Sequence, residues 1–166
     1  MKSVNDLIVD LITTGRQATA EELAIIIAHV AQAPFATYLS RVLKRLRRLI
    51  AKGGAIVPRK LSSLEIHLFK RIYFEKQWPV GTTAKKYVAD LHQAISHPDV
   101  YVWTYRYFGP PFVSFLAPSH VQGGFKPERY IFVAYSPLHG TITTGYQASD
   151  SSKILTDEFT ELVQHR

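Results

Sequence analysis

The segment from 135 to 146 holds the densest group of side chains that could do chemistry. It reads Tyr-Ser-Pro-Leu-His-Gly-Thr-Ile-Thr-Thr-Gly-Tyr, so His139 is followed by several threonine hydroxyls and by the phenol of Tyr146. Cleaving a phosphodiester without a metal requires a base for the attacking hydroxyl, an acid for the leaving oxygen, and donors or a cation for the developing charge. Histidine, arginine, threonine and tyrosine can fill those roles. Threonine is also a common strand residue, so the same pattern is typical of an ordinary strand.

Metal and cofactor chemistry has little support in the sequence. The chain has no cysteine, which excludes disulfides, thiolate zinc sites and cysteine nucleophiles. His92 and His97 have a spacing found in half of some zinc sites, but without cysteines that set of ligands stays incomplete. There is no glycine-rich phosphate loop, zinc-protease helix or nucleophile elbow. We therefore expect neither a metal site nor a cofactor.

The positive charge lies in the first part of the chain. The net charge is +7, and residues 1–52 carry eight Lys or Arg against four Asp or Glu, for +4. Residues 53–97 carry seven Lys or Arg and three Asp or Glu, for another +4. Residues 98–166 carry five Lys or Arg and six Asp or Glu, for −1. Such a field favours polyanions such as nucleic acid or an anionic lipid surface, although it also simply aids solubility.

A helix predicted from about Phe35 to Lys52 carries many of these charges on one face. Its other face is apolar, and Gly53-Gly54 would end it. The basic face consists of Arg41, Lys44, Arg45, Arg48 and Lys52. We interpret it either as a solvated helix face or as a salt-sensitive surface for phosphates. With the preceding helix it could also form a helix-turn-helix, although the usual turn glycine is absent.

The elements that must position these groups fall into two parts. Residues 1–52 are predicted to form a helical segment, and a linker at 53–60 follows. Residues 61–166 are predicted to form a domain of two helices, four strands and a closing helix. Helix starts are marked by Thr19 with Glu22, by Ser62 with Glu65, and by Thr82 or Thr83. The expected fold is α+β, with N-terminal helices followed by a four-stranded, mainly antiparallel sheet and a C-terminal helix.

The strands are predicted from patterns that begin after Pro98. Residues 100–108 alternate in strand periodicity, 112–116 form a short return strand, and 129–135 are nearly continuous apolar sequence. The last strand is predicted at 141–148. The closing helix is predicted from the spacing of Leu155, Phe159, Leu162 and Val163.

One face of the first strand is aromatic. It consists of Tyr101, Trp103, Tyr105 and Tyr107. We expect these rings to pack on the two preceding helices, which would leave Arg106 facing outward beside Thr104. The alternative is a platform on which nucleic-acid bases stack.

The order of two helices and a four-stranded sheet, ending in the strand from Gly140 to Tyr146, resembles the barnase/EndoU/colicin/RelE-like superfamily of small ribonucleases, many of them bacterial toxins. The resemblance covers about residues 61–150. It implies a His, Lys or Arg that works with Ser, Thr or Tyr on the sheet. The matching catalytic positions would be Thr144, Tyr146 and Arg106, with His97 and His120 as candidate bases. The near-neutral charge of residues 98–166 departs from an RNA-binding face, so the helices would have to supply positive charge.

Three functions are compatible with these features. The first is a metal-independent ribonuclease of toxin type, with RNA as its partner. The second is a non-catalytic nucleic-acid-binding or regulatory module that uses the basic helix. The third is a protein-interaction or assembly factor whose apolar N-terminal helices pair with a partner. In the first, the N-terminal helices would instead bind a protein inhibitor or serve delivery or oligomerisation. The first residues do not resemble a signal peptide and the apolar runs are short, so we expect a cytoplasmic protein with no membrane partner. The sequence carries no signal for a particular oligomeric state.

Overall fold

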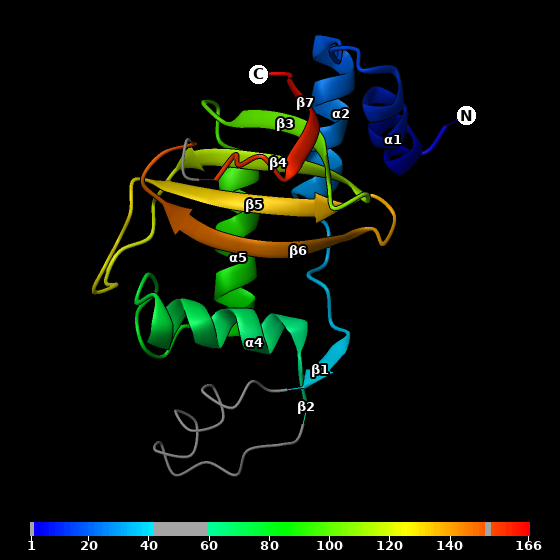
Figure 1. Ribbon diagram of the computed structural model, residues 1–166. Helices are drawn as coiled ribbons and strands as arrows, with labels where there is room; N and C mark the ends of the chain where they lie inside the picture. Colours follow the sequence, from blue (N-terminus) through cyan, green and yellow to red (C-terminus); the bar gives the residue numbers. More distant parts are fainter. Residues whose placement is uncertain (1, 42–59, 152–153) are drawn as a thin grey trace.

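The computed structural model describes residues 2–41, 60–151 and 154–166 and has an α+β fold (Figure 1). Its helices are α1 (Val4–Thr14), α2 (Ala20–Val30), α4 (Ser63–Phe69), the π-helical turn η1 (Lys70–Phe74) and α5 (Ala84–Ile95). Its strands are β1 (Leu39–Arg41), β2 (Lys60–Ser62), β3 (Tyr101–Tyr107), β4 (Pro111–Pro118), β5 (Tyr130–Ser136), β6 (Thr141–Ala148) and β7 (Phe159–Gln164). The predicted α+β class is confirmed. No helix in these described ranges has the length and apolarity needed to cross a membrane.

Short polar motifs start the helices where the sequence predicts them. The hydroxyl of Ser62 accepts a hydrogen bond from the Glu65 N–H at 3.1 Å, and the Glu65 carboxylate accepts one from the Ser62 N–H. Thr19 and Glu22 form the same reciprocal pair at the start of α2, and Thr83 caps α5. These bonds satisfy backbone N–H groups that have no partner within the helix.

The main sheet is antiparallel throughout, in the order β6-β5-β4-β3-β7. Strand β5 lies between two neighbours, and every residue from Ile131 to Ser136 is buried. A strand with neighbours on both sides and buried side chains on both faces accounts for the nearly continuous apolar sequence at 129–135. Helix α5 crosses one side of this sheet, and α1 and α2 lie beside it (Figure 1).

The predicted C-terminal helix is wrong, and so is the count of four strands. Residues Phe159–Gln164 form β7, which pairs with β3 and makes the described sheet five-stranded. The apolar spacing at 155–163 fits a helix, but the free edge of β3 offers a row of backbone partners that a helix would leave unpaired. The pairing is irregular near Thr104 and Arg106, and Glu161 has a left-handed φ of 53° there.

The predicted helix from Phe35 is wrong over its described part. The Ala36 N–H donates to the Ile142 carbonyl at 2.8 Å, and the Ile142 N–H donates to the Pro34 carbonyl at 2.9 Å. Phe35 is buried, and the chain continues into β1, which pairs with β2. These bonds to β6 hold the segment extended, against its local helical pattern. Residues 42–59, which include most of the predicted basic face and of the linker, lie outside the described residues.

The two sides of the sheet carry different residues. We call the side packed on α1, α2 and α5 the helix face; it carries Val102, Val113, Phe115, Ile131, Val133 and Ile142. We call the opposite side the aromatic face; it carries Trp103, Tyr105, Leu116, Phe132 and Tyr146, packed with Ile154 and Phe159. The prediction that the β3 aromatics pack on the helices is therefore wrong. Thr104 is on the helix face and is buried, so it does not point outward as predicted.

The N-terminal helices belong to the main core. Ile8, Leu11 and Ile26 are almost fully buried in the same apolar cluster as the helix face. The phenol of Tyr135 on β5 donates to the Asn5 side-chain oxygen at 2.7 Å. The Ala18 N–H donates to Nδ1 of His165, so the start of the chain is also bonded to its end. The apolar faces of α1 and α2 are thus occupied by contacts within the chain.

Candidate active site: an aromatic cleft

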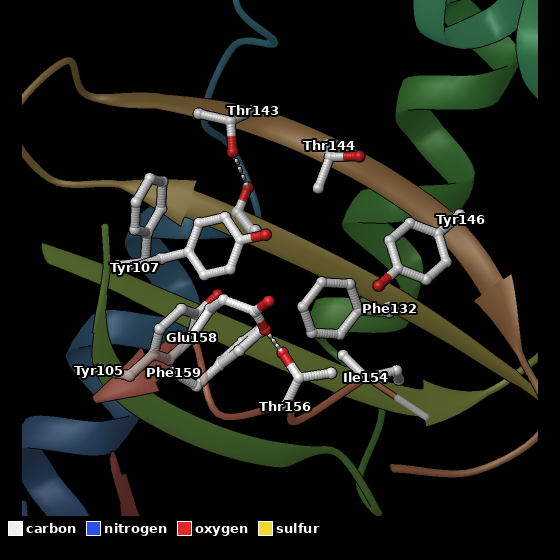
Figure 2. Close-up of a pocket in the computed structure, with 12 residues that line it drawn as sticks. Tyr105, Tyr107, Phe132, Thr143, Thr144, Tyr146, Ile154, Thr156, Glu158 and Phe159 are labelled. Atoms are coloured by element: carbon white, nitrogen blue, oxygen red, sulfur yellow. Dashed lines mark hydrogen bonds between the residues drawn. The ribbon is translucent and has the colours of Figure 1, made fainter. Parts of the chain in front are cut away.

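The aromatic face contains a cavity of about 510 Å³, which we call the aromatic cleft. Its lining consists of Tyr105, Tyr107, Phe112, Phe132, Ala134, Thr143, Thr144, Tyr146, Ile154, Thr156, Glu158 and Phe159. Tyr105, Tyr107 and Phe159 form one ring group, and Phe132 and Tyr146 form another (Figure 2). Residues Thr156 and Glu158 of the C-terminal segment lie across the cleft from Thr143 and Thr144 (Figure 2). The cleft therefore combines aromatic walls with hydroxyl groups and one carboxylate.

A bulge in β6 brings two consecutive threonines to the cleft. In a regular strand neighbouring side chains point to opposite faces. The β5–β6 register shifts between Ala134 and Tyr135, so Ala134 pairs with Thr144 whereas Tyr135 pairs with Ile142. Thr143 is the extra residue, and its hydroxyl donates to the Ala134 carbonyl at 3.3 Å. Bulges often redirect side chains beside functional sites, and this one adds a second hydroxyl to the cleft.

The carboxylate of the cleft is Glu158. It accepts a hydrogen bond from the Thr156 hydroxyl, which lowers the pKa of Glu158, helped by a backbone N–H. The side chain is exposed, and it is therefore ionised at neutral pH. Of the lining residues that the structure describes, Glu158 is the charged one. The sequence pattern did not single it out, because a lone glutamate near a predicted helix resembles any surface charge.

Tyr146 contributes the phenol, which points inward toward Phe132 (Figure 2). The two ring centroids are 5.1 Å apart. Burial raises the pKa of Tyr146, while the positive charge of Arg71 acts in the opposite direction. The phenol therefore stays protonated at neutral pH and is a hydrogen-bond donor. Thr144 and Tyr146, both predicted from the sequence, thus meet in one cavity.

Arg71 supports this part of the cleft from behind. Its Nη2 donates to the Thr144 hydroxyl at 3.0 Å, its Nε donates to the Gly145 carbonyl at 2.6 Å, and its guanidinium carbon lies 5.4 Å from the centre of the Tyr146 ring. The side chain is only 3% exposed and is paired with Glu75 at 2.8 Å. Sequence reasoning missed Arg71, because a single arginine in a predicted helix gives no signal of contacts with a strand more than seventy residues away. It belongs to the π-helical turn η1, and such turns are frequent at functional sites.

Arg106, His120 and His97 are not among the residues that line the cleft. The Arg106 guanidinium donates to Glu161 at 2.9 Å and to the Gly109 carbonyl at 3.1 Å, at the end of the β3–β4 hairpin. His120 contacts the Asp90 carboxylate of α5 at 3.0 Å, and His97 accepts a hydrogen bond from the Asp99 N–H at 3.0 Å. The structure therefore brings together two of the five predicted catalytic residues. Whether the other three act in catalysis stays a prediction.

His120 belongs to a separate polar cluster centred on Asp90. The buried carboxylate also accepts hydrogen bonds from the Trp78 indole at 3.0 Å and from Lys86 at 2.7 Å. Burial alone would raise the pKa of Asp90, but these donors outweigh it and the pKa is lowered. The cluster fixes the loop after β4 against α5. A structural role accounts for every one of its bonds.

The predicted nucleic-acid-binding residues are largely outside the described ranges. Lys44, Arg45, Arg48 and Lys52 fall in the segment 42–59, and Arg41 is the last residue of β1. No group of three or more His, Asp or Glu that could hold a metal occurs in the ranges that the structure describes. No family model, curated protein or solved structure was found to match this chain.

Proposed function

We propose that the protein is a metal-independent ribonuclease and that RNA binds in the aromatic cleft. One observation carries the proposal. Thr144 and Tyr146 share a cavity of about 510 Å³ with the ionised carboxylate of Glu158. That cavity thus holds a proton acceptor, a protonated phenol and threonine hydroxyls within aromatic walls. These are the groups that phosphodiester transfer by general acid–base chemistry requires.

The proposed reaction is an internal transfer at one phosphodiester. Glu158 takes the proton of the 2′-hydroxyl, and the 2′-oxygen attacks phosphorus. The bond from phosphorus to the 5′-oxygen breaks, and Tyr146 gives its proton to that leaving oxygen. The products are a 2′,3′-cyclic phosphate and a 5′-hydroxyl end. Thr144, whose oxygen accepts a hydrogen bond from Arg71 and whose own proton is free, donates a hydrogen bond to a phosphorane-like oxygen, where negative charge develops.

The walls of the cleft favour a single-stranded substrate. Phe112, Tyr146 and Phe159 are half-buried, and Tyr107 is 38% exposed, so their rings retain free surface for stacking. Unpaired bases stack on such rings at about 1–3 kcal/mol each, with little regard to sequence. Among the described residues that line it, the cleft has a carboxylate and no cation. Positive charge for the flanking phosphates would have to come from elsewhere in the chain, whose net charge is +7.

The test is cleavage of a labelled single-stranded RNA in EDTA by the full chain. We expect cleavage to ends that carry 2′,3′-cyclic phosphate, detected by mass spectrometry. Tyr146→Phe and Glu158→Gln should each reduce the rate by roughly 10²–10⁴-fold. Tyr101→Phe and Asp157→Asn are matched controls, because both residues are exposed and neither lines the cleft. Absence of cleavage, or equal rates in all four variants, would contradict the proposal.

A second candidate function is binding of single-stranded nucleic acid without turnover. The observation that favours it is the aromatic lining, which needs no acid–base chemistry to hold bases. In that case, RNA of unchanged length would be recovered from the EDTA reaction. Binding would weaken in Phe112→Ala and would persist in Glu158→Gln. Measuring affinity and cleavage on the same variants therefore separates the two functions.

A further inference from the structure

A second hollow, of about 340 Å³, lies where the turn after η1 meets the loop between β4 and β5. We call it the Phe125 groove. Its lining consists of Ile72, Tyr73, Lys76, Val80, Phe125 and Lys126. None of these residues lines the aromatic cleft. The Phe125 groove is therefore a separate feature of the surface.

The groove displays large apolar side chains to solvent. Phe125 is 84% exposed, Val80 is 67% exposed and Tyr73 is 42% exposed. Single exposed apolar residues are common on protein surfaces, but several around one hollow form a patch of the kind found at interaction sites. Aromatic side chains that pack into hollows are also the usual anchors of protein interfaces.

The backbone beneath the groove is held rigidly. The Lys126 N–H donates to the Lys76 carbonyl at 2.8 Å, which joins the two segments directly. Gln77 and Gln147 exchange three hydrogen bonds of 2.7–2.9 Å between side chain and backbone, all of them buried. Gly124 lies so close to Gln77 that a Cβ there would be 2.5 Å from its carbonyl oxygen. Phe125 is thus presented by a fixed loop, so that a partner would not have to order it.

The charged side chains that line the groove are both positive. Lys76 and Lys126 are both exposed, and neither ammonium lies within 4.0 Å of a carboxylate of the residues that the structure describes. No acidic side chain is among the described residues that line the groove. Lys76 also has a left-handed φ of 57°, which is uncommon for a residue with a side chain and points its carbonyl to Lys126. The groove therefore joins an apolar hollow to two unpaired cations.

We propose that the Phe125 groove binds an acidic segment of another protein. An apolar side chain of that segment fills the hollow beside Phe125 and Val80, and flanking Asp or Glu residues contact Lys76 and Lys126. The hollow favours a protein segment over a membrane, because an inserted side chain can fill it, whereas a bilayer would contact only the projecting Phe125 and Val80. The bound segment would contact Ile72 and Tyr73 of η1. The same turn carries Arg71, which holds Thr144 in the aromatic cleft.

The test uses the full chain and a short fluorescein-labelled peptide in which Trp and Leu are flanked by Asp and Glu. We expect saturable binding by fluorescence anisotropy, with amide shifts in NMR spectra confined to the groove. Phe125→Ser should weaken binding about tenfold or more, and so should the double variant Lys76→Glu with Lys126→Glu. Leu138→Ser is the matched control, because Leu138 is 61% exposed in the β5–β6 turn, outside the groove. Equal melting temperatures of the variants would establish that their fold is intact.

Several outcomes would overturn the proposal. The first is that the acidic peptide does not bind. The second is that a peptide with Lys in place of its Asp and Glu residues binds equally well. The third is that Phe125→Ser leaves the affinity for the acidic peptide unchanged. Binding to vesicles of phosphatidylserine and phosphatidylcholine tests the membrane alternative. If they bind the wild type more tightly than the peptide does and lose binding in Phe125→Ser, the groove is a membrane surface. None of these measurements depends on RNA cleavage. The outcome for the Phe125 groove is therefore independent of whether the protein is a ribonuclease.

Discussion

The two faces of the sheet are made by the same strands but differ in how completely their side chains are packed. On β4, Phe115 points to the helix face and is fully buried, whereas Phe112 points to the aromatic face and is half-buried at the cleft. The helices close the first face. The second is covered only in part, by residues such as Ile154 and Phe159 of the C-terminal segment. Stability is therefore concentrated on one side, and surface available for a ligand on the other.

The largest expected effect comes from truncating the same residue type on each face. Phe115→Ala should lower the free energy of unfolding by about 3–5 kcal/mol, because it leaves a cavity within the helix-face core. Phe112→Ala should lower it by only about 1 kcal/mol, because a partly exposed ring can be replaced by water. Urea unfolding followed by circular dichroism measures both. Equal losses would show that the aromatic face is as much a closed core as the helix face.

A smaller loss is expected from Gly145→Ala on the helix face. A Cβ at Gly145 would lie 2.5 Å from both terminal methyl carbons of Leu91 on α5. The Leu91 side chain would have to shift, at about 1–3 kcal/mol. The same change would disturb the Gly145 carbonyl, which accepts hydrogen bonds from Arg71 and Tyr87. Thermal unfolding measures the effect.

A double-mutant cycle identifies the cause of that loss. Leu91→Ala removes the methyl groups that a Cβ at Gly145 would meet. Gly145→Ala should therefore cost less in the Leu91→Ala background than in the wild type, by about 1 kcal/mol. Strict additivity would mean that the loss arises from the backbone bonds of Gly145 and not from contact between β6 and α5.

Much of the local structure on both faces could be predicted from the sequence. The pair Ser62 and Glu65 identified the start of α4, and alternation identified β3, because both signals lie within a few residues. Alternation predicted that Ile142, Thr144 and Tyr146 share one face. Thr144 and Tyr146 do line the cleft, but the bulge at Thr143 turns Ile142 to the helix face. In β3 the alternation pointed to the wrong face: the face that carries Thr104 and Arg106 is the more polar one, yet its Val102 and Thr104 are buried on the helix side.

The features that could not be predicted depend on contacts between distant segments. The strand β7 exists because β3 has a free edge, and its own apolar spacing fits a helix equally well. Arg71 contacts Thr144 through a π-helical turn that no local motif marks. Glu158 reaches the cleft because the C-terminal segment folds over the aromatic face. For these residues the local sequence shows which functional groups are present, but it does not determine where the fold places them.

The helix-side interior should also make the stability depend on pH. Burial lowers the pKa of His67 to about 4, where its ring packs on Phe35 and its Nδ1 is bonded to the Ser63 carbonyl. Between about pH 6.5 and pH 4 the unfolded chain binds a proton at His67 that the folded chain does not, so stability falls as the pH falls. We expect a loss on the order of 1–2 kcal/mol over that range, measured by urea unfolding at each pH.

His67→Gln provides the control for this pH dependence. Glutamine removes the titrating group and keeps polar atoms near the Ser63 carbonyl. The loss of stability between pH 6.5 and pH 4 should be smaller in this variant. His165 has its own lowered pKa through burial and remains as a residual contribution. An unchanged pH profile in His67→Gln would assign the whole dependence to other groups.

The smallest expected effect is at Arg106, which was a predicted catalytic residue. Its guanidinium is bonded to Glu161 and to the Gly109 carbonyl, and the side chains of the Arg106–Glu161 pair are 32% and 54% exposed. Exposed pairs contribute little, so Arg106→Ala should cost less than about 1 kcal/mol of unfolding free energy. If the reaction takes place in the cleft as proposed, the rate of RNA cleavage by this variant should stay within about twofold of the wild type, because Arg106 does not line the cleft. If Arg106→Ala lost cleavage a hundredfold while its stability was unchanged, we would infer that the reacting phosphate lies near the β3–β4 hairpin. The aromatic face would then be a binding surface next to the active site, and the contrast between the two faces would no longer locate the chemistry.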